Sequence, residues 1–91
     1  MTLRIERRRS GDTLIVQLIG EFDNEHLEEV KAQVYDAPFP VVVDIGDLAL
    51  ISVEGIRFLN ACQHNGTQII NASGYITEWM TLEGQSEPKR P

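Results

Sequence analysis

The sequence predicts an α/β domain with a small mixed β-sheet of about four strands and about three helices packed mainly on one face. Short apolar or alternating segments are interleaved with segments in which apolar residues recur every three to four positions, in the order ββαβαβα. Residues 41–43 are consecutive valines, a pattern typical of a strand buried on both faces. A chain of 91 residues has room for a single core, which favours helices gathered on one side of the sheet.

The first two strands are expected to form a β-hairpin. Leu3, Ile5 and then Arg7 alternate with the charged residues at positions 4, 6 and 8, a pattern typical of a half-buried strand. Residues 10–12 (SGD) are of the types that favour a tight turn, and the second strand follows over residues 13–19. Gly20 and the polar residues 21–24 are expected to end that second strand.

The first helix is expected to begin at Asp23 or Asn24, either of which can accept a hydrogen bond from an unpaired backbone N–H. Leu27, Val30 and Val34 then recur at helical spacing. The prolines at positions 38 and 40 end this helix and start the next strand, which we expect over residues 41–44. A short apolar loop is predicted to follow Asp44.

The second helix is predicted from about Val53 to His64, with Ser52 as its N-cap and Asn65-Gly66 as its end. Gly55 lies in its first turn, where close packing against a strand is favoured over the approach of a partner. Cys62 is expected to be a buried thiol, because it lies on the apolar side of this helix.

A short strand over residues 67–71 and a final amphipathic helix after Ser73-Gly74 complete the predicted elements. Trp79 in that helix can pack on the sheet or lie in an exposed recognition patch, and packing is the preferred interpretation.

Composition and charge exclude several classes of protein. The net charge is −6, yet residues 1–10 contain four Arg and one Glu, so the remaining residues sum to −9. An acidic body argues against nucleic-acid binding, which needs clustered Lys and Arg. No apolar run approaches the roughly 20 residues that span a bilayer, and the N-terminus lacks the apolar region of a signal peptide. The single cysteine fits a reducing compartment, so a cytoplasmic location is expected.

We expect neither catalysis, metal binding nor a cofactor. His26 and His64 lie on different helices without a second ligand at metal-binding spacing. The glycines are scattered, and no Gly-Lys-Ser/Thr phosphate loop is present. Asp44 could fix a local geometry by accepting backbone N–H groups, or it could simply end its strand, and the residues alone leave both interpretations open.

Two motifs in this element order resemble those of the STAS domain, the fold of bacterial anti-sigma factor antagonists that is also found appended to anion transporters and sensor complexes. Residues 20–23 (GEFD) follow the second strand. Residues 44–47 (DIGD) match a segment like Asp-Leu-Ser-Gly, and residues 52–55 (SVEG) match the later Asp-Ser-Ser-Gly that opens a helix. The resemblance covers roughly residues 3–83, and it implies one STAS-like domain over residues 1–84. The polar, proline-containing residues 85–91 are expected to form a disordered tail.

The resemblance also implies a site and a departure from it. In regulated antagonists, the second residue of the later motif is the serine that a partner kinase phosphorylates, whereas this chain has Val53 there. Phosphorylation at that position is therefore excluded, and Ser52 is a minor candidate that requires a shifted register. Glu54 places a fixed negative charge near the same helix start.

The resemblance implies a non-enzymatic module for signalling and transcription regulation in bacteria. Its partner would be an anti-sigma factor or a kinase-like switch protein. The segment from residue 44 to residue 52 and the first turns of the second helix would form the docking surface, with these contact residues: Asp23, Asp44, Asp47, Ser52, Val53, Glu54, Gly55 and Arg57. Alternatives are an accessory subunit of a transporter or enzyme complex and a small-ligand sensor. Exposed edge strands would also allow a homodimer.

Overall fold

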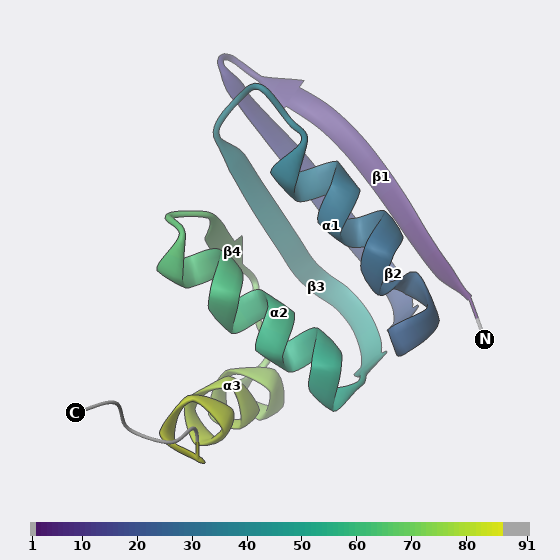
Figure 1. Ribbon diagram of the computed structural model, residues 1–91. Coiled ribbons are helices and arrows are strands. Elements are labelled where there is room, and N and C mark those ends of the chain that lie inside the picture. Colours follow the sequence, from purple (N-terminus) through teal and green to yellow (C-terminus); the bar gives the residue numbers. More distant parts are fainter. Residues whose placement is uncertain (1, 87–91) are drawn as a thin grey trace.

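A computed structural model describes residues 2–86, and its sheet contains four strands in the order β1-β2-β3-β4 (Figure 1). The elements are β1 (Leu3–Ser10), β2 (Thr13–Phe22), the short helix η1 (Asn24–His26), α1 (Leu27–Tyr35), β3 (Val41–Ile51), α2 (Val53–His64), β4 (Gln68–Ile70) and α3 (Gly74–Ser86). β1 is antiparallel to β2, whereas β2, β3 and β4 run parallel to one another. The predicted mixed α/β sheet and element order are confirmed.

The helices α1 and α2 lie over the same face of the sheet (Figure 1). The burial of β2 alternates accordingly: Leu14, Val16 and Leu18 are at most 2% exposed, while the residues between them are half-buried. Hydrophobic side chains thus converge between the sheet and the helices, because alternate residues of a strand point to opposite faces.

Strands β2 and β3 are longer than the sequence predicts, and this corrects the expected apolar loop after Asp44. The segment from residue 45 to residue 51 is part of β3 and stays paired with β2 up to Phe22. Two register shifts between these strands absorb extra residues of β3. Gly20 does not end β2: it adopts φ +104°, where an added Cβ would lie 2.5 Å from the carbonyl oxygen of Thr2.

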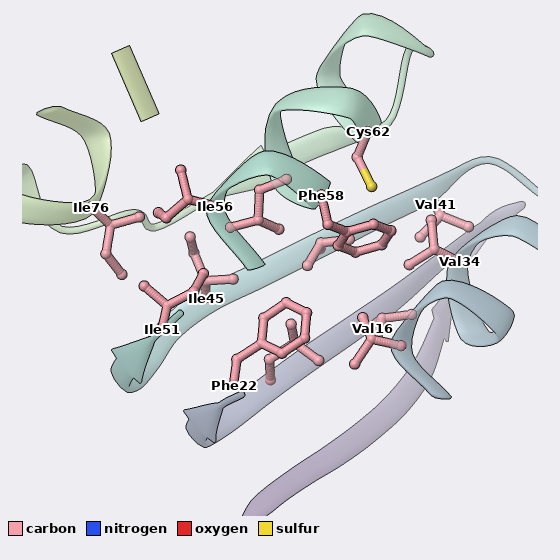
Figure 2. Close-up of a cluster of buried hydrophobic side chains, with 14 of the residues drawn as sticks. Val16, Phe22, Val34, Val41, Ile45, Ile51, Ile56, Phe58, Cys62 and Ile76 are labelled. Carbon is pink, nitrogen blue, oxygen red and sulfur yellow. The ribbon is translucent and has the colours of Figure 1, made fainter. Parts of the chain in front are cut away.

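The buried cluster joins all the major elements (Figure 2). Helix α1 contributes Val30 and Val34, as its spacing predicts. Helix α2 contributes five buried residues, namely Gly55, Ile56, Phe58, Leu59 and Cys62. Helix α3 contributes Ile76 and Met80, and Trp79 packs partly buried against the cluster, in line with the preferred interpretation.

Helix α3 continues to Ser86, two residues into the segment expected to be a disordered tail. The rest of that predicted tail, residues 87–91, lies outside the described residues.

Cys62 is a fully buried thiol at the contact between α2 and Tyr35. Burial raises its pKa from 9.0 to about 11, although a hydrogen bond with the Tyr35 side chain opposes that rise. Burial and the neighbouring Cys62 likewise raise the pKa of the Tyr35 hydroxyl. The folded protein therefore favours the protonated thiol, whereas the unfolded chain ionises near the ordinary value.

This difference predicts a loss of stability in alkali. The stabilising contribution of protonated Cys62 is fully present below pH 9.0 and is lost as the pH rises toward about 11. Each pH unit in that window lowers the free energy of unfolding by about 1.4 kcal/mol through this group. Urea unfolding at several alkaline pH values measures the slope, with Cys62→Ala as the control in which this contribution is absent. Identical slopes for both proteins would contradict the prediction.

Candidate protein-interaction surface

The start of α2 is fixed to the ends of two strands by hydrogen bonds around Ser52. The backbone N–H of Ser52 donates to the carbonyl oxygen of Phe22 at 2.9 Å, which ties the exit of β3 to the end of β2. The Ser52 hydroxyl oxygen accepts from the backbone N–H of Gly55 at 3.1 Å. Ser52 is therefore the N-cap of α2, as predicted, and its oxygen satisfies one of the N–H groups that a helix start leaves unpaired.

A shallow hollow of about 220 Å³ lies beside this junction. Its lining comes from the ends of β2 and β3, where Glu21 pairs with Leu50 and Phe22 pairs with Ile51, together with Asp23 and Ser52. Leu50 is 54% exposed, so the hollow has an apolar side chain at its rim. We call this hollow and the first turn of α2 the junction surface.

The first turn of α2 presents a polar and an apolar side chain to this surface. Val53 is half-buried and Glu54 is exposed. Arg57, one turn further on, lies 3.5 Å from the Glu54 carboxylate and donates from Nε to Glu83 of α3 at 3.0 Å. Arg57 therefore connects the first turn of α2 with α3.

Asp23 occupies the N-cap of η1 on the other side of the hollow. Its backbone N–H donates to Nδ1 of His26 at 3.2 Å, and Nε2 of His26 lies 3.4 Å from the Glu25 carboxylate. Because Nδ1 acts as the acceptor, the neutral imidazole carries its proton on Nε2 and directs it toward Glu25. Asp23 is exposed and lines the hollow, so its carboxylate belongs to the junction surface.

Asp44 does not lie at the surface, because it is only 9% exposed. Its Oδ1 accepts from the backbone N–H of Gly46 at 3.0 Å and from the side-chain amide of Asn71 at 3.1 Å. Of the two interpretations left open by the sequence, the first is therefore right: the carboxylate fixes local geometry. It holds β3 to the segment after β4, where Asn71 adopts φ 63°.

Gly55 is also buried, and packing explains it. An added Cβ would lie 2.8 Å from Cγ1 of Ile51 and 3.3 Å from Cδ2 of Phe22. The glycine therefore lets α2 approach the ends of β2 and β3. Gly55 therefore shapes the candidate surface, whereas Asp44 pairs with Gln17 and lies further from the hollow along β3.

Asp47 is exposed and accepts from the side-chain amide of Gln17 at 3.0 Å. It pairs with Ile19, before the strands end, so it is separated from the hollow along β3. The structure thus groups Asp23, Ser52, Val53 and Glu54 at the junction surface and places Asp47 on the sheet.

Sequence reasoning missed Glu21 and Leu50 at the hollow. Both were assigned to segments expected to be irregular, whereas they are a cross-strand pair in the structure. The general rule that binding sites of parallel sheets lie at the carboxyl ends of the strands could have indicated both residues.

The charges are distributed unevenly along the strands. Glu21, Asp23 and Glu54 lie at or beside the junction surface, at the carboxyl ends of β2 and β3. Residues 7–9 are three consecutive arginines near the β1–β2 turn, at the other end of the sheet (Figure 1). The guanidinium of Arg9 lies 4.0 Å from the centre of the Phe39 ring.

The part of the chain from residue 2 to residue 86 contains no group of three or more His, Cys, Asp or Glu side chains arranged to hold a metal ion. None of the helices in this part combines the length and the apolar composition that crossing a membrane requires.

The mixed sheet, the helices on one face and the capped helix at the end of β3 define a domain with a STAS-like fold, as the sequence resemblance implies. The structure of the anti-sigma factor antagonist SpoIIAA in its unphosphorylated form is similar to that of this chain. It aligns with a TM-score of 0.69 and 16% identity, over 89% of this chain and 83% of that one.

A second similar structure is an uncharacterized protein of the DUF3478 family from Shewanella loihica PV-4, described as having a SpoIIAA-like fold. It aligns with a TM-score of 0.44 and 20% identity, over 91% of this chain and 77% of the other. No protein-family model and no curated protein matches the sequence.

Proposed function

We propose that this chain is a non-enzymatic interaction module that works in the manner of an anti-sigma factor antagonist. Its partner would be an anti-sigma factor or a kinase-like switch protein in the bacterial cytoplasm, and the complex would influence transcription. The observation that supports this most is the junction surface, where Ser52 caps α2 directly beside the hollow between the strand ends. The similarity in fold to SpoIIAA supports this class of partner.

Docking would use the exposed groups of this surface. Asp23 and Glu54 supply negative charge, while Leu50 and Val53 supply apolar contact area. Protein interfaces combine such a small apolar centre with a charged rim. Arg57 would hold Glu54 in position through its contact at 3.5 Å.

The module would not be released by phosphorylation at the usual position. A phosphate group adds about −1.5 to −2 charges and can abolish docking. Val53 has no hydroxyl group, and the Ser52 oxygen already accepts a hydrogen bond from Gly55. We propose that the surface stays competent for binding when the partner kinase has ATP.

The experiment is a titration of the purified chain with a partner identified by pull-down from the host. Val53→Glu and Glu54→Arg are expected to weaken binding by at least about tenfold, because both change the first turn of α2. Glu78→Arg is the matched control, since this exposed residue lies on α3, away from the hollow. Equal losses with all three variants, or no loss with the first two, would contradict the proposed surface.

The same titration repeated with ATP tests the absence of control by phosphorylation. Binding is expected to be unchanged, and the intact mass of the chain is expected to show no added phosphate. A stoichiometric mass shift that Ser52→Ala removes would refute this part of the proposal. Recovery of a transporter component as the partner would instead support the accessory-subunit alternative.

A further inference from the structure

The face of the sheet opposite α1 and α2 is uncovered by any helix among residues 2–86 (Figure 1). In β2, this face is formed by the positions that alternate with the core residues. They are half-buried rather than fully buried, and they are Thr13, Ile15, Gln17, Ile19 and Glu21. We call this surface the open face.

Charge and apolar character are arranged on the open face in rows that follow the strands. The central row on β2 contains Ile15 and Ile19. In the strand register, Arg4 of β1 lies beside Ile19 on one side, and Asp47 of β3 lies beside Ile19 on the other. An apolar residue is thus flanked by a cation and an anion at the same level.

The neighbouring residues extend both outer rows. Residues of one face alternate along a strand, so Glu6 and Arg8 continue the row of Arg4 on β1. This row has a formal charge of +1, whereas the exposed Asp47 gives the row on β3 a charge of −1, because the Asp44 carboxylate is buried against Gly46 and Asn71. The two strands that flank β2 therefore have opposite charge on this face.

We propose that the open face binds a second copy of this chain, with the two-fold axis parallel to β2. Rotation about such an axis places β1 of one copy opposite β3 of the other and places β2 opposite itself. Arg4 of each copy then faces Asp47 of the other, and the isoleucines of the central rows meet. At the level of Ile19 the pattern is complementary to itself, as an isologous interface requires. At the level of Gln17, Glu6 faces Asp44, whose carboxylate is buried against Gly46 and Asn71.

The side chains of Arg4 and Asp47 are long enough to meet across the gap between the two sheets. Sheets packed face to face lie about 10 Å apart, a gap that a long arginine and a short aspartate can fill together. The Arg4 side chain is 70% exposed and contacts Glu6 at 3.0 Å, but a guanidinium has five N–H donors and can bind a second carboxylate. Asp47 uses Oδ2 toward Gln17, and a carboxylate can accept more than one hydrogen bond.

Pairing of two β1 edges is disfavoured by the three arginines at residues 7–9, because charged edge strands resist edge-to-edge association. Stacking of faces avoids that repulsion. In this arrangement β4 has no strand opposite it, so β1, β2 and β3, about 4.8 Å apart, give a contact of roughly 400 Å² per copy. This value is below the usual range for specific interfaces, so the dimer is expected to be weak and to exchange rapidly.

The test is analytical ultracentrifugation of the full chain alone, from about 10 μM to about 1 mM, a range suited to weak interfaces. The native chain is expected to shift from monomer to dimer across that range. Arg4→Glu and Asp47→Arg are each expected to raise the dissociation constant by at least about tenfold, because both symmetric ion pairs become repulsive. Glu78→Arg serves as the control for a charge change off the open face.

Mixing the two variants gives the decisive measurement. In a mixed dimer, Glu at position 4 of one copy faces Arg at position 47 of the other, and the native Arg4 and Asp47 form the second pair. The mixture is therefore expected to dimerise like the native chain, as is the double variant. A native chain that stays monomeric at about 1 mM overturns the inference. So does a mixture that stays as weak as its components. Neither outcome concerns partner docking at the junction surface, because this assay contains only the chain itself.

Discussion

Replacing Phe22 by alanine is expected to lower the free energy of unfolding by about 3–5 kcal/mol. Phe22 is 1% exposed and lies at the end of β2, where its ring packs edge-on against Phe58 with 6.1 Å between the ring centres. Its carbonyl oxygen also accepts the N–H of Ser52, so the residue joins the core to the start of α2. Urea unfolding followed by circular dichroism measures the loss.

Tyr35→Ala is the matched control for Phe22→Ala. The Tyr35 ring also packs edge-on against Phe58, at 5.7 Å, but the residue is 48% exposed. Its removal leaves little cavity, so we expect a loss of about 1 kcal/mol, the size of an aromatic pair contribution. Similar losses for both variants would show that burial at Phe22 does not determine the effect.

Gly55→Val is expected to destabilise the fold by about 2–3 kcal/mol, because the new side chain overpacks the contact between α2 and the strand ends. The added Cβ would lie 2.8 Å from Cγ1 of Ile51, a distance that real Cβ atoms do not tolerate. Replacement of glycine within a helix normally gains up to about 1 kcal/mol in propensity, and less for a β-branched residue. The steric cost is larger, so the net effect is a loss.

Gly74→Ala separates this steric effect from the general consequence of replacing a helical glycine. Gly74 also lies in the first turn of a helix, yet no atom lies within 4 Å of its added Cβ. We expect its stability to change by no more than about 0.5 kcal/mol. Thermal unfolding of both variants checks the contrast, and an equal loss at Gly74 would contradict the packing explanation for Gly55.

The boundaries of α2 were predictable because their determinants are local. Ser52 caps the helix through an N–H three residues away, and Gly66 after its end adopts φ 91°. A short stretch of sequence contains all the information that such hydrogen bonds and dihedral angles require. The predicted limits, Val53 and His64, are those of the structure.

The length of β3 was not predictable in the same way. Gly46 and Asp47 interrupt its apolar run, so the pattern predicts an end at Asp44. Pairing with β2 continues past these residues through register shifts, and it depends on residues of β2 that lie 28 or 29 positions earlier in the chain. Tertiary pairing therefore extends the strand where local preference would end it.

The residues of the candidate site also differ in whether local sequence or distant strand pairing determines their position. The position of Ser52 and Glu54 at a helix start follows from neighbouring residues, whereas the meeting of Glu21 with Leu50 follows from the β2–β3 register. The role of Asp44 depends on Asn71, which is 27 residues away. A single sequence shows which residue types are present, but it does not show which distant residues pair or form hydrogen bonds with one another.

The uneven placement of charge along the strands has a consequence for how another macromolecule would approach. With arginines 7–9 near the hairpin turn and carboxylates at the opposite end, the molecule has a permanent electric dipole along the sheet. In the field of a positively charged surface, such a dipole rotates so that its carboxylate end leads. Collisions with such a partner would thereby be biased toward the proposed docking orientation before any side chains touch.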